Sequence, residues 1–333
     1  RMASCSTQPL AVAGATPQPR IVTVPGSASM GHNTDLAAGR VVLNMWSRFY
    51  LADSCGPLPA SYTAWQLLGR TFSFTVELSG TGCGCNLAVY TAEMQTNTQV
   101  GTCSDGTSGL YYCDANSVCG VRCDEIDIME ANHRAFHSVA HQWWDGSGRG
   151  GGFGGSHGHP GTTYGPGGSV IDTARPFRVS TTFSGGGSGG RLSSIMTRLE
   201  QEGRQTSWSM APQNYLRGLH SSTSRGLTLV LSYWSSGSNG MWWLDRPPCA
   251  DYASPTCGAA TLYDFAITGG APPPPLPPPP LPPLPCAPPL PTGDVRTCDA
   301  SAALSLGRAC ACSYSWADGC DEAPNGVELV CER

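Results

Sequence analysis

The chain has 333 residues, a net charge of −5 and only 13% charged residues. This length suits one large β domain or two smaller domains. Every basic residue is an arginine and none is clustered, which argues against nucleic acid or an anionic membrane as the main partner. No apolar run reaches the roughly 18 residues that a membrane-spanning helix needs.

The chain also contains 16 cysteines. They form no paired CxxC motifs and no HExxH motif accompanies them, so we expect neither a metal nor another cofactor. Oxidised structural cysteines are typical of secreted proteins. We therefore expect an extracellular protein whose signal peptide is not present in this chain, because the first residues lack an apolar signal core.

Residues 1–270 carry short strand-like runs separated by turn residues. Residues 71–78 alternate strictly between apolar and polar side chains, as a half-buried strand does. Residues 192–202 are the one segment that favours a helix. Many short strands joined by Gly and Pro turns predict an all-β sandwich of two antiparallel sheets. Further strand candidates are residues 41–45, 48–51, 86–90, 177–183, 227–233 and 260–268.

Two segments of different composition follow this first domain. Residues 271–292 are almost entirely Pro and Leu, which predicts a semi-rigid polyproline II linker. A ligand for an SH3-like domain is the alternative, and it fits a Cys-rich chain poorly. Residues 293–333 hold five cysteines, with Cys286 just upstream, and predict a small disulfide-rich module. This module could bind sugar through Tyr314 and Trp316, or serve as a cap or a protein-contact module.

A run of acidic residues marks the candidate catalytic strand. Along residues 125–130 (EIDIME), Glu125 and Asp127 share one face because side chains alternate on a strand. Glu130 has the wrong parity, and one β-bulge would bring it to the same face. The two isoleucines of the run, on the opposite face, would then pack in the core.

Three acids on one face repel each other, and a structural strand gains little from that. A retaining glycosidase uses one carboxylate as nucleophile and a second, protonated carboxyl as acid, about 5–5.5 Å apart. A third acid between them can share a proton with the nucleophile. A solvated acidic edge strand is the alternative, which the alternating isoleucines and the absence of Lys or Arg in the run disfavour.

Residues 123–132 (CDEIDIMEAN) resemble the signature C-x-E-M-D-I-W-E-A-N of glycoside hydrolase family 7, a family of cellulases. The resemblance implies a concanavalin A-like jelly roll. It also implies that Glu125 is the nucleophile, Asp127 its supporting acid and Glu130 the general acid/base. His141, eleven residues after Glu130, matches a histidine that lines the family's cleft.

Family 16 β-glucanases carry nearly the same acidic run, so the flanking segments decide between the two families. Several of them resemble family 7 motifs in the right order, namely residues 67–76, 83–90, 112–116, 164–167, 171–173 and 229–245. Sugars present flat apolar faces with polar edges, so clefts bind them with aromatic platforms and hydrogen-bonding groups. The candidate sugar-binding residues are Trp234 and Trp243, as platforms on either side of the scissile bond, with Tyr90, Asn86, Asp114 and Asn116 for hydroxyl contacts or for holding the nucleophile.

Neighbouring aromatic and histidine residues receive other assignments. Trp242 alternates with Trp243 and should point into the core. His133 and His137 are expected at the surface. His157 and His159, in Gly-rich sequence, could reach the cleft.

Departures from the family pattern carry further expectations. Met129 replaces the signature Trp, and an unbranched Met should fill that space without disrupting the strand. By comparison with the family, Cys113 pairs with Cys123, whereas Cys119 has lost its partner. The loops that roof the cleft in this family are short here, which favours an open groove and therefore endo-action.

We accordingly predict a monomeric, retaining endo-β-1,4-glucanase that acts on β-glucan in an open cleft. The alternatives are a family 16-like β-1,3- or mixed-linked glucanase, a lectin-like sugar binder that has lost turnover, and a wall or scale component in which the Pro-rich rod matters most.

Overall fold

The computed structural model describes residues 3–103, 110–144, 153–156, 163–185, 190–236, 241–245, 249 and 255–269. They lie within a compact unit that spans Arg1–Pro272. The predicted linker at 271–292 and the predicted tail at 293–333 lie outside the described residues. Among those residues, no helix is long and apolar enough to cross a membrane.

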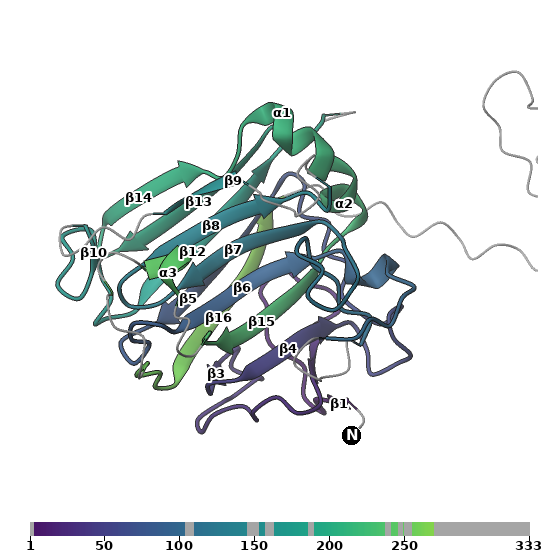
Figure 1. Cartoon of the computed structure of the whole chain (residues 1–333), viewed down its shortest axis with the longest axis horizontal. Helices are drawn as coiled ribbons and strands as arrows, with labels where there is room; N and C mark the ends of the chain where they lie inside the picture. The colour runs from purple at the N-terminus through teal and green to yellow at the C-terminus, as the bar shows by residue number, and fades with distance from the viewer. Residues whose placement is uncertain are drawn as a thin grey trace, which may run out of the picture. The chain divides into compact units, whose positions relative to one another are not determined.

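Two antiparallel sheets form the body of the molecule (Figure 1), as predicted for an all-β sandwich. In spatial order, the eight-stranded sheet contains β1 (Ser4–Cys5), β2 (Arg20–Thr23), β4 (Ser47–Ala52), β15 (Thr228–Trp234), β6 (Asn86–Ala92), β7 (Glu125–Ala131), β8 (Phe136–His141) and β9 (Phe153–Ser156). The six-stranded sheet contains β14 (Arg204–Ser209), β13 (Ser194–Gln201), β12 (Phe177–Ser184), β5 (Arg70–Glu77), β16 (Ala260–Gly269) and β3 (Val41–Leu43).

Short elements complete the described fold. A parallel pair joins β10 (Tyr164–Gly165) to β11 (Ile171–Asp172). The helical elements are η1 (Met94–Thr96), α1 (Gln213–Leu216), η2 (Arg217–Leu219), α2 (His220–Arg225) and α3 (Trp242–Asp245).

The main core lies between the two sheets and follows from the alternation of side chains. On β6, Leu87 and Val89 join this core together with Phe72 and Phe74 of β5. The next residues along β6, Ala88 and Tyr90, face the opposite side and pack in a second cluster. The eight-stranded sheet therefore has a core face and an outer face, and the outer face carries the candidate site.

The prediction of a helix at residues 192–202 is wrong, because this segment forms β13. Its burial alternates, with Ile195 and Leu199 buried and Met196 exposed. Pairing with both β12 and β14 supplies its backbone hydrogen bonds. Burial at a period of two and pairing on both edges override the local helical preference.

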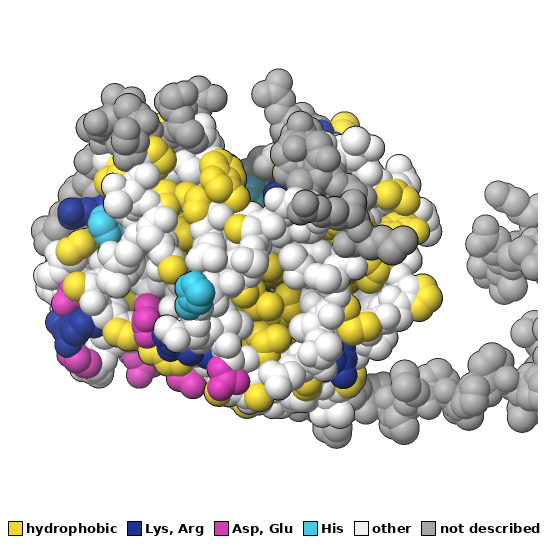
Figure 2. Space-filling view, turned by 90° about the horizontal axis from the view of Figure 1, so that it is seen from below, with side chains coloured by type: hydrophobic (Ala, Val, Ile, Leu, Met, Phe, Trp, Pro, Cys, Tyr) yellow, Lys and Arg dark blue, Asp and Glu magenta, His cyan; other side chains and the backbone are white. Residues whose placement is uncertain are grey.

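The face in Figure 2 carries few charged side chains. Hydrophobic and uncharged side chains predominate there, and the acidic side chains gather along the lower left edge. The ion pair between Arg40 and Glu77 lies beside β3 and β5 of the six-stranded sheet. Exposed pairs of this kind contribute little stability.

Five disulfides crosslink the described residues. Cys113–Cys123 is among them, as the family resemblance implied. Cys119, which has lost the partner that the family has, pairs here with Cys103. The remaining pairs are Cys5–Cys55, Cys83–Cys249 and Cys85–Cys257.

Candidate active site

A β-bulge in β7 sets the direction of the three carboxylates. On β6, the neighbours Val89 and Tyr90 pair with Met129 and Asp127, so Ile128 is the extra residue. The pairing with β8 also shifts in this stretch, between Asp127 and Glu130. Ile128 and Met129 are both fully buried in the main core. The predicted bulge is therefore present, and Glu130 shares the outer face with Asp127.

A cleft of about 840 Å³ lies on this outer face. Its lining brings together nearly all of the predicted site residues, although they come from distant parts of the sequence. Those that line it are Glu125, Asp127, Glu130, His141, Tyr90, Asp114, Asn116, Trp234 and Trp243.

Glu125 lies at the start of β7 with its side chain buried. The backbone N–H of Ala115 donates to Glu125 Oε2 over 3.0 Å. Burial raises the pKa of Glu125 well above its usual range, and the charges of Asp127 and Asp114 raise it further. His141 and the Ala115 N–H oppose this rise because both favour the ionised carboxylate.

Asp127 occupies the middle of the acidic group. Its Oδ2 lies 3.1 Å from Nε2 of His141, which extends from the adjacent strand β8. Burial and the nearby charge of Asp114 raise the pKa of Asp127. The charge of Asp127 in turn raises the pKa values of Glu125 and Glu130.

Glu130 is held by a different kind of partner. Asn86 Nδ2, at the start of β6, donates to Glu130 Oε1 over 2.9 Å. Burial, and secondarily the charge of Asp127, raises the pKa of Glu130 to about 8. The expectation that Asn86 contacts sugar or holds the nucleophile is wrong, because its side chain is fully buried and bonded to Glu130 instead.

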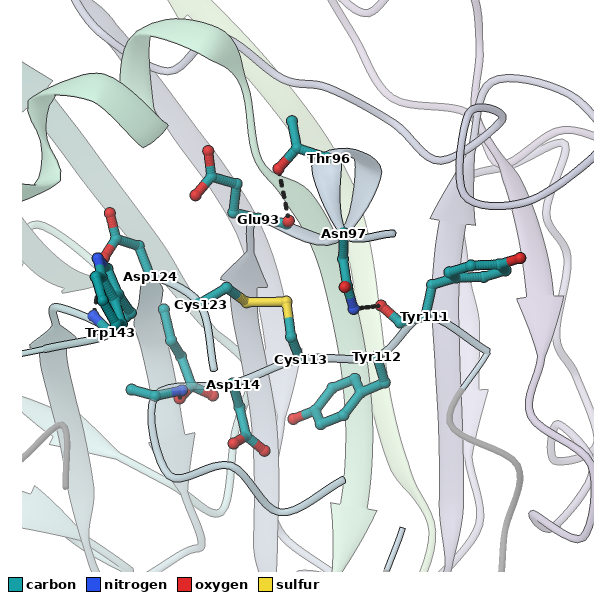
Figure 3. Close-up of a disulfide and its surroundings, with 12 residues drawn as sticks. Glu93, Thr96, Asn97, Tyr111, Tyr112, Cys113, Asp114, Cys123, Asp124 and Trp143 are labelled. Carbon is teal, nitrogen blue, oxygen red and sulfur yellow. Dashed lines mark hydrogen bonds between the residues drawn. A yellow bond between two sulfur atoms is a disulfide. The ribbon is translucent and has the colours of Figure 1, made fainter. Parts of the chain in front are cut away.

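The loop before β7 supplies the groups around Glu125. Figure 3 shows the Cys113–Cys123 disulfide, with Tyr112 and Asp114 extending to the same side of the loop. Tyr112 lies with its hydroxyl 2.9 Å from that of Tyr90. Cys123 stands two residues before Glu125, and Cys113 two residues before Ala115. The disulfide thus joins Glu125 to the segment that carries its N–H donor.

The tryptophans differ from the prediction in two respects. The rings of Trp234 and Trp243 stack on each other, with centroids 6.3 Å apart and planes inclined at 28°. They therefore lie against each other in the cleft lining rather than apart. Trp242 is 64% exposed rather than in the core, because residues 242–245 form helix α3 and not a strand. Successive side chains of a helix do not point to opposite faces.

The position of one histidine also differs from the prediction. His137, expected at the surface, lines the cleft with its ring edge-on to Trp243 at 6.0 Å. His157 and His159 lie outside the described residues.

The cleft also contains residues that the sequence did not single out. Trp46 lines it, is 59% exposed and has a φ of 68°. Arg48 lines it and lies over the Tyr112 ring at 4.9 Å. The left-handed backbone that directs Trp46 outward has no local sequence signal, because that conformation is rare for a bulky residue.

Clustered carboxylates and two stacked tryptophans thus share one outer face of a two-sheet β-sandwich. Comparison with known proteins shows which proteins this chain is similar to. The family model described as "Glycosyl hydrolase family 7" matches residues 30–120. The comparisons, taken together, confirm the resemblance to glycoside hydrolase family 7.

Two curated relatives and one solved structure are representative of the matches. Endoglucanase EG-1 of Hypocrea jecorina is 32% identical over 240 residues, which cover 61% of this chain and 50% of the relative. Endo-beta-1,4-glucanase celB of Emericella nidulans is 28% identical over 265 residues, covering 60% of this chain and 61% of the relative. This chain therefore spans only about half to three-fifths of the length of these two relatives.

The fold comparison reaches further along the chain. The endocellulase EGI of Humicola insolens superposes with a TM-score of 0.53 at 22% identity, covering 69% of this chain and 76% of that structure. This likeness confirms the predicted jelly-roll sandwich.

Proposed function

We propose that this chain is a retaining endo-β-1,4-glucanase. The observation that carries the proposal is the bulge in β7, which turns Glu125, Asp127 and Glu130 toward one cleft. The names of the matched relatives, an endoglucanase and an endo-β-1,4-glucanase, support the reaction and the linkage.

In the proposed reaction, ionised Glu125 attacks the anomeric carbon while Glu130 gives its proton to the leaving oxygen. Glu130 then accepts a proton from the water molecule that hydrolyses the glycosyl–enzyme bond. A pKa of about 8 suits Glu130 to the first step, since an acid must hold its proton at the working pH. The Ala115 N–H and His141 favour the ionised form of Glu125 that attack requires.

Asp127 lies between these two carboxyls along β7 and pairs with His141. We assign it to the exchange of a proton with Glu125, because the charge of Asp127 raises the pKa of Glu125. The stacked pair Trp234 and Trp243 serves as a platform for the sugar beside Glu130, and Tyr90, Asp114 and Asn116 supply polar contacts along the lining.

The mode of action and the setting of the enzyme are part of the same proposal. Short loops around the cleft favour entry of an internal chain segment. The disulfides of the described residues suit an extracellular protein. We further propose that the protein is monomeric, that residues 1–270 form the catalytic domain, and that residues 271–292 link it to a disulfide-rich module at 293–333.

A product profile on soluble glucans tests the proposal. We expect a rapid fall in the viscosity of carboxymethylcellulose, and proton NMR of the first product should show the β anomer. Activity on laminarin but not on barley glucan or cellulose would favour a β-1,3-glucanase. Oligosaccharide binding with no hydrolysis of any glucan would replace the proposal with a lectin-like function.

A further inference from the structure

Helix α3, which carries the platform residue Trp243, is too short to be stable by itself. Met241 and Leu244 anchor it by packing on Ala135, next to Trp234 and Trp243. Ala135 belongs to the turn between β7 and β8. The position of the platform therefore depends on how α3 is attached to the end of the strand that bears Glu130.

A buried carboxylate makes that attachment. Asp245, the last residue of α3, is fully buried. Its Oδ2 accepts two hydrogen bonds, from the backbone N–H of Gly84 at 2.9 Å and from Asn132 Nδ2 at 2.8 Å. Without this acceptor, the Gly84 N–H and one of the two N–H groups of the Asn132 amide would be left unsatisfied.

Asn132 extends this network to the catalytic strand, since it follows β7 directly and stands two residues after Glu130. Its Nδ2 also donates to the carbonyl oxygen of Cys85 at 3.0 Å. Its Oδ1 accepts the backbone N–H groups of Arg134 at 2.7 Å and Ala135 at 3.0 Å. One buried amide thus holds the turn after β7, the segment before β6 and Asp245 together.

Two disulfides fix the Gly84 side of the network. Cys83 pairs with Cys249, whose backbone N–H donates to the Asp245 carbonyl at 2.9 Å, and Cys85 pairs with Cys257. Cys83, Asp245 and Cys249 lie close enough together to suggest a metal site. Both sulfurs are in a disulfide, so they offer no thiolate ligand, and the cluster is better explained as a structural anchor.

We propose that Asp245 is a positioning residue that holds the Trp234–Trp243 platform in register with Glu130, acting through Asn132. The inference rests on the proposed function, because it takes Trp243 as a sugar platform and Glu130 as the proton donor. Asp245 contacts neither substrate nor reacting atoms. Its effect is geometric, because one oxygen atom receives both donors.

If the position of the Asp245 oxygen matters, variants that keep, displace or remove this oxygen should differ in their effects. Asp245→Asn keeps an oxygen that can accept both donors and should raise KM less than the other two variants. Asp245→Glu keeps the charge but displaces the oxygen by one methylene, and Asp245→Ala removes it. We expect these two variants to raise KM for cello-oligosaccharides about tenfold with a smaller change in kcat, because small displacements of positioning groups are costly. The pair therefore separates geometry from charge, and Asp245→Glu carries the test if Asp245→Ala does not fold.

A double-mutant cycle identifies the route of the effect. In a Trp243→Ala background, Asp245→Glu should raise KM little further, because its target is already absent. Asp172→Ala is the matched control, since Asp172 also accepts two backbone N–H groups, from Gly167 and Ala174, but does not line the cleft. Full additivity of Asp245→Glu and Trp243→Ala, or wild-type KM in Asp245→Glu and Asp245→Ala, would overturn the proposal.

A readout that needs no hydrolysis separates this inference from the proposed function. Stacked indoles give an exciton-coupled circular-dichroism signal, and the Trp234–Trp243 contribution is defined by subtracting the spectrum of Trp243→Phe. We expect Asp245→Glu to lose this contribution and Asp245→Asn to retain it. If the wild-type chain cleaved no glucan but the signal behaved in this way, the function would fail and the anchor would stand. An unchanged signal in Asp245→Glu would refute the anchor.

Discussion

The two ends of β7 hold their glutamates in contrasting ways. Glu125 takes a hydrogen bond from the backbone of Ala115, on a loop that a disulfide joins to the strand, and faces the further acid Asp114. Glu130 takes its bond from the neutral side chain of Asn86. Both pKa values are raised chiefly by burial, but Asp114 contributes only to the rise at Glu125.

One strand therefore places two glutamates in different electrostatic surroundings. Part of the rise at Glu125 comes from neighbouring charges, so it is relieved whenever one of those neighbours is protonated. Burial is the largest cause of the raised pKa at both glutamates, and the charge of Asp127 adds to it at Glu130 as well. Two neighbouring acids, Asp127 and Asp114, thus add to the rise in pKa at Glu125, whereas only Asp127 adds to the rise at Glu130.

The largest expected effect on activity is at Glu125, at the start of β7. Glu125→Gln removes the proposed nucleophile but keeps an oxygen that can accept the Ala115 N–H. We expect turnover of soluble β-1,4-glucan to fall by about 10⁴-fold or more. Thermal unfolding should show equal or higher stability, because a buried acid with a raised pKa has been removed. Glu93→Gln, which alters a carboxylate paired with Arg225 outside the cleft lining, should retain activity. A near-wild-type rate in Glu125→Gln would refute the assignment.

Substitution of Glu130 should have a smaller effect on turnover and a distinct effect on how stability depends on pH. Glu130→Gln should lower turnover by about 10²–10⁴-fold, the usual contribution of a general acid. The folded pKa of Glu130 is raised from 4.5 to about 8, so its stabilising contribution is complete below about pH 4.5 and is lost as pH rises through about 8.

Each pH unit between those values costs at most about 1.4 kcal/mol of unfolding free energy. Denaturant unfolding at pH 5 and pH 8 measures this loss. The Glu130→Gln protein should lose less stability over that interval than wild type does. An identical loss in both proteins would show that Glu130 does not titrate there.

The sequence predicted those parts of the site that follow from strand periodicity. Alternation placed Glu125 and Asp127 on one face, and the parity of Glu130 required the bulge that is present at Ile128. Periodicity also identified residues 71–78, which correspond closely to β5 (Arg70–Glu77). These features depend on neighbours along a single strand, so the sequence contains them.

Other features depend on groups that are distant in the sequence. For these features, predictions were either not made or were wrong. Extending the alternation to Trp242 failed because the segment turns into α3. Asn86 was assigned to the sugar, whereas the pairing of β6 with β7 places it against Glu130. The Cys103–Cys119 pair could not be deduced, because several pairings are possible among ten cysteines.

The smallest expected effect tests the contrast between the two ends most directly. Asp114→Asn removes a charge that raises the pKa of Glu125 and of Asp127 but is not among the causes of the rise at Glu130. The Val118 N–H donates to Asp114 Oδ1, and an asparagine oxygen can still accept it. We therefore expect the acid limb of the activity profile to move to lower pH while the alkaline limb stays in place.

The pH dependence of kcat/KM on a soluble cello-oligosaccharide measures both limbs, with Asp172→Asn as a control remote from the cleft. The sign follows from the charges, because removing a nearby negative charge makes it easier to ionise Glu125. A parallel shift of both limbs would mean that Asp114 acts on the whole acidic group. A shift of the alkaline limb alone would reverse the proposed roles of the two glutamates, since the residue next to Asp114 would then be the one that must keep its proton.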